Sequence, residues 1–360
     1  MSASTWRKNK PNAEGRRERA AMITIKELAD KLGVSTTTIS NVIHGKTGEV
    51  SQTTIEMVQR AVRDYNYIPN MSARALAQKS SRIIGVVLKF NPQKELNALQ
   101  DPFAGELMGA LEASIREAGY YMMQYVAPNV GDIVRLMKTW NVDGLVLSGF
   151  HAQDYKQIRA QTQKPMVFVD CYFGDMGIPY SNVGLEDQTG GRIMTEYLIS
   201  LGHERIAYLS DNQIGNDWMR WLGYCDAMEA AGLPYSEAEN YIRLRPGWTE
   251  YFKSLAPALE PRDRFTALFF ASDYYAMRGF DYLYDHGFRI PEDISVAGFD
   301  DNILSQNLRP RLTTIHQNPT DKACLAFEML MGLIRRETEE GETIRLPVEL
   351  VVGGTTAPPR

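Results

Sequence analysis

Five hydroxyl side chains lie within six consecutive residues, in the stretch STTTIS at positions 35–40. Threonine is a middling helix former, because its branched Cβ restricts χ1 and its hydroxyl competes for backbone hydrogen bonds. Ile39, Val42 and Ile43 nevertheless recur at the spacing of one helical face. The pattern therefore predicts a short helix with an unusual hydroxyl-rich surface.

The chemistry of these hydroxyls suits contact with a nucleic acid. Ser35 can cap the helix, whereas Thr36, Thr37 and Ser40 project away from the apolar face. Thr38 stands at the third helical position, where a glutamate is common and would repel phosphate. Short donors at a helix N-terminus can reach phosphate oxygens and base edges, and a threonine methyl can touch a thymine methyl. The competing interpretation is a threonine-rich surface helix without a partner.

A second set of polar residues follows apolar runs further along the chain. Asp170 ends the run PMVFVD, Asp273 comes just after FFAS, and Arg220 opens a helical turn in WMRWLGY. Two carboxylates and a guanidinium offer rigid, charge-assisted hydrogen bonds to the vicinal hydroxyls of a polar ligand. For either aspartate alone, a structural helix cap is the competing interpretation.

The charge distribution separates the chain into a basic head and an acidic remainder. Residues 1–80 contain 13 Lys and Arg against 7 Asp and Glu, while the 360-residue chain carries a net charge of −5. A basic segment favours contact with a polyanion, although many basic segments are only solvated.

We expect residues 1–22, which are polar and basic, to be a disordered extension and not a secretory signal. No apolar run is long enough for a membrane span, and the three cysteines fit neither a disulfide framework nor a zinc site.

Capping and stop signals place three short helices in the head. Thr24 and Glu27 form a predicted capping box, and Gly33 follows as a stop signal. A second helix is expected from Ser35, and a third from Ser51. Two short helices joined by a glycine turn, with a third that closes a small core, describe a helix-turn-helix module.

After Ser81 the pattern changes to alternating strands and helices. Short apolar runs such as RIIGVVL and DGLVLSG alternate with helical stretches, and the cycle starts again after YSNVG at 180–184. Such repetition predicts parallel sheets covered on both faces. Two units of this kind would form two lobes, with a ligand crevice at the carboxyl ends of the strands.

The chain after residue 22 resembles the lactose-repressor (LacI/GalR) family. The resemblance rests on TIKELADKLGVSTTTISNVIHGK, on VSQTTIEMVQRAVRDYNYIPNMSARALA, and on later blocks such as VDGLVLSG, LGHERIAYLS and RIPEDISVAGFDD in family order. It implies a small all-α helix-turn-helix DNA-binding domain plus an α/β periplasmic-binding-protein-like (type I) two-lobed effector and dimerisation domain. The implied boundaries are 1–22 for the extension, 23–69 for the DNA-binding domain, 70–81 for a hinge helix and linker, and 82–360 for the effector domain. Within 82–360 we expect lobes of about 82–183 plus 292–321 and 184–291 plus 322–360, joined by three crossovers.

The resemblance also implies which residues meet DNA. In the family, a hinge leucine pries open the minor groove, and the matching residue is Leu76, next to Ala73. Asn41 stands where the family often has an arginine, and His44 where it has an asparagine, so the operator sequence stays open. The full set of expected DNA-binding residues is Thr24, Ser35, Thr36, Thr37, Ser40, Asn41, His44, Ser51, Tyr67, Asn70, Ala73 and Leu76.

The family's effector positions fall on residues of both lobes. Arg278 departs from a small glycine in the family, which puts local packing or pocket shape in doubt. Phe103 and Trp248 match aromatic positions, for which ordinary core packing is the competing interpretation. The expected effector-binding residues are Phe103, Asp170, Asn216, Arg220, Trp248 and Asp273.

The resulting expectation is a cytoplasmic, nucleoid-associated transcriptional regulator. It would be a homodimeric repressor of a pseudo-palindromic operator, with DNA affinity controlled by a small, carbohydrate-like effector, and with neither cofactor nor metal nor membrane contact. A corepressor or a non-sugar effector is the alternative. A solute-binding protein would have the same two lobes without the head, and an enzyme is disfavoured because no phosphate loop or G-x-S-x-G nucleophile motif occurs.

Overall fold

The computed structural model describes residues 23–43, 45–67, 80–89, 97–127, 129–174, 177–245 and 247–360. The chain divides into two compact units, Met1–Lys79 and Ser80–Arg360, which agrees with a boundary near the predicted hinge. We call the described part of the first unit the head, and the second unit the body. The predictions for residues 1–22, for the hinge at 70–79 and for His44 lie outside the described residues.

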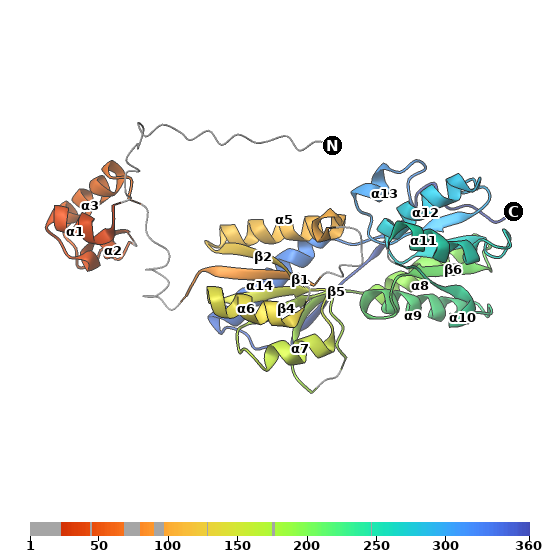
Figure 1. Ribbon diagram of the computed structural model, residues 1–360, viewed down its shortest axis with the longest axis horizontal. Helices are drawn as coiled ribbons and strands as arrows, with labels where there is room; N and C mark the ends of the chain where they lie inside the picture. Colours follow the sequence, from red (N-terminus) through yellow and green to blue (C-terminus); the bar gives the residue numbers. More distant parts are fainter. Residues whose placement is uncertain are drawn as a thin grey trace, which may run out of the picture. The chain divides into compact units, whose positions relative to one another are not determined.

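The head is a bundle of three helices around one small core (Figure 1). It consists of α1 (Ile25–Leu32), α2 (Thr36–Ile43) and α3 (Gln52–Asp64). Gly33 ends α1 with a φ of 65°, a left-handed conformation that glycine adopts without strain. The fully or nearly buried core residues are Leu28, Ala29, Ile39, Val42, Val58, Ala61 and Tyr67. The predicted helix-turn-helix arrangement is therefore confirmed.

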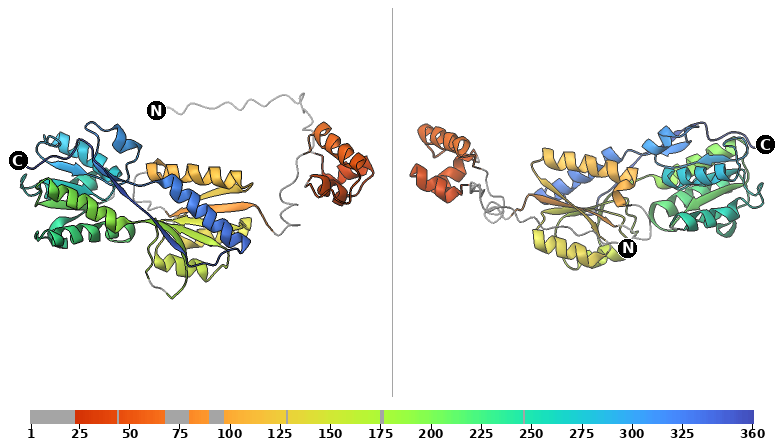
Figure 2. Two further views of the ribbon diagram at one scale, coloured as in Figure 1. Left: turned by 180° about the vertical axis from the view of Figure 1, so that it is seen from behind. Right: turned by 45° about the horizontal axis from the view of Figure 1, so that its top comes forward.

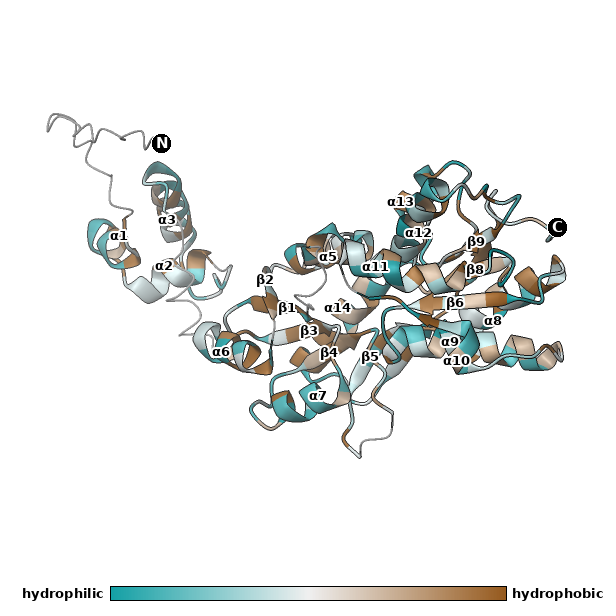
Figure 3. Ribbon diagram, turned by 45° about the vertical axis from the view of Figure 1, so that its right-hand side comes forward, coloured by the Kyte–Doolittle hydropathy of each residue, from teal (hydrophilic) through white to brown (hydrophobic). Residues whose placement is uncertain are grey.

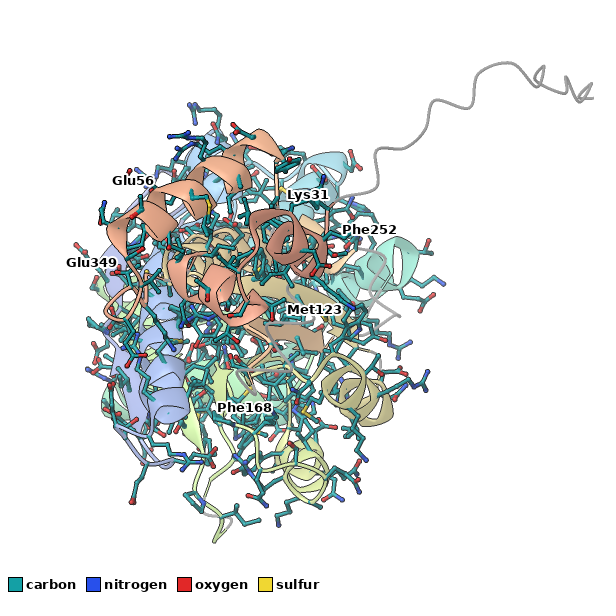
Figure 4. The ribbon with its side chains drawn as sticks, turned by 90° about the vertical axis from the view of Figure 1, so that its left-hand side faces the viewer. Lys31, Glu56, Met123, Phe168, Phe252 and Glu349 are labelled. Carbon is teal, nitrogen blue, oxygen red and sulfur yellow. The ribbon has the colours of Figure 1, made fainter. Side chains whose placement is uncertain are left out.

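Lobe 1 of the body is a six-stranded parallel sheet with helices on both faces. The strand order is β11-β5-β4-β3-β1-β2, and the strands are β1 (Ile83–Lys89), β2 (Tyr121–Ala127), β3 (Gly144–Ser148), β4 (Met166–Val169), β5 (Ser181–Leu185) and β11 (Thr343–Leu346). One face packs against α5 (Pro102–Glu117), preceded by the short η1 (Ala98–Gln100), and against α14 (Pro319–Arg335). The other face packs against α6 (Val130–Trp140) and α7 (Ala152–Arg159). Phe168 of β4 lies inside this second core (Figure 4).

Lobe 2 repeats this plan with a four-stranded parallel sheet in the order β7-β6-β8-β9. The strands are β6 (Ile206–Ser210), β7 (Tyr241–Arg243), β8 (Ala267–Phe270) and β9 (Ser295–Ala297). One face packs against α8 (Asp187–Ser200) and α9 (Gly215–Ala230), and the other against α11 (Trp248–Leu255) and α12 (Asp273–Asp285). The short elements are α10 (Glu237–Asn240), η2 (Ala256–Ala258) and α13 (Ile303–Asn307). The strands of both lobes are apolar, and the helices turn hydrophilic faces outward (Figure 3).

The chain passes between the lobes three times, as predicted. It crosses after β5, between β10 (Thr314–His316) and α14, and between β11 and β12 (Glu349–Val351). Strands β10 and β12 pair antiparallel in a separate two-stranded sheet. These crossings connect the carboxyl ends of the strands in lobe 1 to lobe 2.

The predicted division of the C-terminal segments between the lobes is wrong. We expected 292–321 in lobe 1 and 322–360 in lobe 2, but β9 pairs with β8 of lobe 2. Strand β11 pairs with β5 of lobe 1, and α14 lies beside α5 (Figure 2). The physical reason is that α14 shares with α5 the apolar cover of one face of the lobe 1 sheet. The final segment then returns to lobe 2, where Val296 donates its backbone N–H to the carbonyl of Thr355.

Within the described ranges, no helix combines the length and the apolar character that a membrane crossing requires.

Candidate nucleic-acid interface and effector site

The hydroxyls of α2 divide into a capping pair and an exposed group. Ser35 Oγ accepts a hydrogen bond from the backbone N–H of Thr38 at 3.0 Å, and the two hydroxyls lie 2.8 Å apart. Thr36 and Thr37 are exposed, and Asn41 is partly exposed beside the buried Ile39–Val42 face. The first turn of α2 has no acidic residue, so its positive end is open to an anion. This surface can therefore hold phosphate oxygens and present short donors to base edges.

Ser51 and Thr24 cap the other two helices, with different consequences. Ser51 Oγ accepts from Thr54 N at 3.2 Å, and α3 also lacks an acidic residue in its first turn. Thr24 instead forms the predicted capping box, in which its N–H and Oγ both donate to Glu27 Oε2 at 2.8 and 2.9 Å. These hydrogen bonds lower the pKa of Glu27, which keeps a negative charge at the start of α1. Ser51 is thus better placed than Thr24 to meet a phosphate.

Tyr67 closes the head core, with only 9% of its surface exposed. Its burial gives it a packing role and does not support the expectation that it contacts DNA. Ser40 is partly exposed on α2. Charged side chains such as Lys31 and Glu56 project from the outer faces of α1 and α3 (Figure 4). The expected DNA-binding residues Asn70, Ala73 and Leu76, like His44, lie outside the described part of the chain.

A fully buried lysine holds Asp170 at the end of β4. Lys322 Nζ donates to both carboxylate oxygens of Asp170, at 2.8 and 2.7 Å, and to Gln317 Oε1 at 2.8 Å. The ring of Phe103 lies 4.9 Å from the same ammonium. Burial raises the pKa of Asp170, and the charge of Lys322 opposes this shift. All three ammonium donors are therefore used within the protein.

Arg220 lies at the centre of a second buried pair, in lobe 2. Its Nε donates to Asp187 Oδ1 at 2.8 Å, and Nη1 donates to the carbonyl of Ala271 at 2.6 Å. Its guanidinium stacks 3.5 Å from the ring of Phe299. Burial alone would lower the pKa of Arg220, but the neighbouring aspartates, first Asp187, raise it overall. The arginine is thus held rigidly in its charged form.

Tyr172 connects this pair to lobe 1. Its hydroxyl donates to Asp187 Oδ2 at 2.6 Å and accepts from the backbone of Leu185 at 3.0 Å. Burial raises the pKa of Tyr172, and so does the charge of Asp187. A polar cavity of about 300 Å³ adjoins the pair at the junction of β5 and α8, and it is lined by Tyr172, Leu185, Glu186, Asp187, Gln188, Thr189, Arg192, Met219, Asp226 and Arg345.

Asp300 completes a hydrogen-bonded chain across the lobes. Gln317 accepts from Lys322 and donates from Nε2 to Asp300 Oδ1 at 2.6 Å. Burial and the charge of Asp273 raise the pKa of Asp300 well above its ordinary value, while Arg220 opposes the shift. The backbone of Asp300 has a φ of 135° and that of Asp170 a φ of 56°. Side-chain-bearing residues rarely adopt such values, and backbone strain of this kind gathers at functional sites.

Asp273 does not lie where an effector could reach it. Its side chain is fully buried, Oδ1 accepts from Thr314 Oγ1 at 2.6 Å, and Oδ2 accepts from Asn302 N at 3.1 Å. Asp273 therefore ties α12 to the loop before α13 and to β10. The expectation that it binds the effector is corrected, because both oxygens are used by the protein and none of its surface is exposed.

The remaining predicted effector residues are spread over both lobes. Phe103 is partly buried in α5 beside Lys322, and Asn216 is partly exposed in the first turn of α9, one turn before Arg220. Trp248 begins α11. Arg278 is 5% exposed in α12, and its guanidinium lies 5.1 Å from the ring of Tyr251. Arg278, which stands where the family usually has a glycine, is thus accommodated by packing inside lobe 2.

Sequence reasoning missed Asp187, Asp300, Gln317 and Lys322. The strand-end argument that selected Asp170 applies equally to Asp300, which follows the run ISVAGF. Lys322 has no such signal, since a lysine within a helix is normally assigned to the surface. Within the described ranges, no group of three or more His, Cys, Asp or Glu side chains is arranged to hold a metal ion.

Comparisons with known proteins match both parts of the chain. The model of "Bacterial regulatory proteins, lacI family" matches residues 24–70, and that of a "Periplasmic binding protein-like domain" matches residues 195–356. The chain is 30% identical over 341 residues to the HTH-type transcriptional repressor PurR of Pasteurella multocida, covering 92% of this chain and 98% of the relative. It is also 30% identical over 351 residues to the HTH-type transcriptional regulator CelR of Thermobifida fusca, covering 95% and 96%.

Solved structures resemble the fold over the same length. A lac repressor dimer bound to operator and the anti-inducer ONPF superposes with a TM-score of 0.81 at 26% identity, over 93% of this chain and 99% of the other. A complex of the transcriptional regulator CelR with cellobiose superposes with a TM-score of 0.69 at 26% identity, over 92% and 99%.

Proposed function

Because this chain belongs to the lacI family and is a DNA-binding transcriptional regulator under effector control, we propose that it acts as a homodimeric repressor of a pseudo-palindromic operator. Its effector is a small polar molecule of the carbohydrate class, and its place of action is the cytoplasm. The observation that carries the effector role is the hydrogen-bonded chain from Asp170 in lobe 1 through Lys322 and Gln317 to Asp300 in lobe 2.

The head supports the DNA-binding half of this proposal. Exposed Thr36 and Thr37 stand at the N-terminus of a helix that has no acidic residue in its first turn. In a helix-turn-helix protein, the second helix enters the major groove with such N-terminal residues toward the base edges. Asn41 then favours adenine, because an amide matches the N6 and N7 positions of that base. The operator half-site is therefore expected to contain an adenine where many relatives would read guanine.

The body supports the effector half. The chain of hydrogen bonds lies at the carboxyl ends of β4 and β9, the edge at which parallel sheets bind ligands. The free oxygen of Asp300, Arg220 and the ring of Phe103 offer an acceptor, donors and an aromatic face, a combination that suits a polyol ring. Binding there changes DNA affinity only if the effector prefers one arrangement of the lobes over the other.

The relatives support a carbohydrate and leave the direction of the response to experiment. The CelR structure contains cellobiose, and the lac repressor structure contains operator with an anti-inducer. We propose induction, in which the effector releases operator. An effector that strengthens operator binding would instead make the protein a corepressor-dependent regulator.

The test begins with operator selection from random duplex DNA by the full-length protein. Fluorescence anisotropy on the selected duplex then measures affinity against salt and against a panel of mono- and disaccharides. We expect a palindromic consensus, a steep decrease in affinity with salt, and release by at least one sugar. Selection that recovers no consensus would contradict the operator proposal, and a consensus without any sugar response would contradict the carbohydrate proposal.

Leu76 gives a separate test of the hinge. Leu76→Ala is expected to weaken operator binding about tenfold or more and to leave the effector concentration for half-maximal response unchanged, because an apolar wedge acts only on DNA. The matched control is Leu99→Ala, which removes an exposed leucine of the body. Unchanged operator affinity in Leu76→Ala would remove the wedge assignment.

A further inference from the structure

The charged groups between the lobes form one connected network with an excess of carboxylates. Asp170, Asp187 and Asp300 interact electrostatically with Arg220, and Asp300 also with Asp273. Asp101, the N-cap of α5, adds a further negative charge toward Asp300 from lobe 1. Within the described part of the chain, Lys322 and Arg220 are the cations paired with these five carboxylates, which we call the acidic network.

Both cations are already neutralised by the protein. Lys322 is fully buried and directs its three donors to Asp170 and Gln317. The side chain of Arg220 is 4% exposed, carries Asp187 on Nε and Ala271 on Nη1, and has the ring of Phe299 against its face. An anion that entered would find both of these cations already paired, and close like charges repel strongly in a buried environment.

Among Asp170, Asp187, Asp273 and Asp300, the carboxylate that keeps an open acceptor within the described residues is Asp300. The two oxygens of Asp170, of Asp187 and of Asp273 each receive hydrogen bonds from the protein. Asp300 receives only the Gln317 amide, on Oδ1, and within the described residues no donor reaches its Oδ2. This oxygen lies open to a hydroxyl or an ammonium of a ligand.

From this arrangement we infer that the effector is an uncharged polyol or an amino sugar, and that sugar acids and sugar phosphates are excluded. The inference rests on the proposed role of the acidic network as the effector site. The Lys322–Asp170 pair then contributes to ligand specificity. It is held rigidly, and it leaves the lysine without a free donor for an acidic ligand. Membership of the family does not decide between uncharged and acidic effectors. The side chains of the acidic network favour the uncharged ones.

The first experiment uses inorganic phosphate as the anionic probe, on the full-length protein. Thermal unfolding is measured against phosphate concentration, with chloride at equal ionic strength as the reference. Phosphate stabilises many proteins without saturation, so the saturable part of the shift in Tm is the readout. Wild type is expected to show none, whereas Asp170→Asn, which frees the Lys322 ammonium, is expected to gain a saturable rise of a few degrees.

The matched control is Glu340→Gln, which frees a partly buried cation at another point of lobe 1. Arg159 Nη2 pairs with Glu340 Oε1 at 2.5 Å, with 13% and 23% of the side chains exposed. This variant is expected to behave as wild type. A saturable phosphate shift in wild type would overturn the inference, and so would a folded Asp170→Asn without any gain.

The second experiment needs no variant. Matched sets of a neutral hexose, its 2-amino derivative, its uronic acid and its 6-phosphate, in the gluco, galacto and manno series, are titrated onto the protein–operator complex. Where a ring binds, the acid and the phosphate are expected to bind at least tenfold more weakly than the neutral form, and the amino sugar at least as tightly. An acid or a phosphate that binds equally well would overturn the inference.

The two experiments also separate this inference from the proposed function. If no sugar changes operator affinity and the phosphate results hold, the carbohydrate proposal fails and the exclusion of anions stands. If a sugar acid or phosphate releases operator, the proposed function stands and the exclusion fails.

Discussion

The surface of α2 and the acidic network of the body are built on opposite principles. On α2, Ser35 and Thr38 hydrogen-bond within one turn, and Thr36 and Thr37 are exposed neutral hydroxyls. In the body, Asp170 meets a lysine 152 residues away, and both side chains are almost completely buried. The first surface can lose a contact without unfolding the protein, whereas in the second the side chains that we propose to recognise the effector also stabilise the fold.

The largest expected effect comes from breaking the buried pair of the body. Lys322→Met leaves Asp170 without its cation and is expected to lower the free energy of unfolding by about 3–5 kcal/mol, because an unpaired buried charge is costly. Urea denaturation of the full-length protein measures it. Lys253→Met is the control, since Lys253 pairs with Glu250 at the surface and should cost less than about 1 kcal/mol. Equal effects of the two variants would remove the distinction between the two regions.

Arg220 tests whether recognition in the body depends on rigid geometry. Arg220→Lys keeps the positive charge. The ammonium of lysine cannot reproduce the two hydrogen bonds that the planar guanidinium donates to Asp187 and to the Ala271 carbonyl. We expect the effector concentration for half-maximal operator release to rise about 100-fold, which corresponds to about 2.7 kcal/mol. Operator affinity without effector should change less than threefold. Arg116→Lys, at a surface pair with Glu112, is the control and should change neither quantity.

Asp273 provides a pH test of burial in the body. Burial raises the pKa of Asp273 to about 6, although hydrogen bonds from Thr314, Ser305 and Asn302 oppose the shift. Between pH 4 and 6 the folded protein therefore holds a proton that the unfolded chain releases, and stability decreases as the pH rises. Relative to Asp273→Asn, wild type should lose about 2–3 kcal/mol of unfolding free energy from pH 4 to 6.5.

Asp293 should show the opposite sign. Hydrogen bonds from Arg289 lower the pKa of this exposed carboxylate, so its contribution is present above the unfolded pKa and is lost as the pH falls. For Asp273 the contradicting outcome is a pair of parallel pH profiles. If wild type and Asp273→Asn lost stability equally between pH 4 and 6.5, Asp273 would not titrate in that range.

The same contrast explains what the sequence could predict. The capping of α1 by Thr24 and of α2 by Ser35 was readable because each cap lies within three residues of its partner. Asp170 and Arg220 could be selected as strand-end and helix residues, but their partners Lys322 and Asp187 depend on how the sheets bring distant segments together. Local pattern carries no information about a buried lysine opposite a strand end.

The C-terminal segments were misassigned for a related reason. Strands β9 and β11 are three and four residues long. Their local pattern does not say which sheet they join, and that choice depends on which face α14 covers. Asp273 and Asp300 both follow strands, and the local pattern cannot rank them, because the burial of Asp273 and the positive φ of Asp300 are properties of the folded chain.

The smallest expected effects concern α2, where Ser35 is expected to stabilise the helix and Thr36 to contact DNA. Ser35→Ala removes the cap of α2 and should lower the stability of the head by about 1 kcal/mol, seen as faster hydrogen exchange of α2 amides in the full-length protein. Thr36→Ala should leave that exchange unchanged or slower, since alanine is the better helix former, and should weaken operator binding about 3–10-fold. On a local, exposed surface the two properties thus belong to neighbouring residues. If Thr36→Ala kept full operator affinity while Ser35→Ala lost it, the hydroxyls would serve only to hold the helix, and the head would resemble the body in combining both roles.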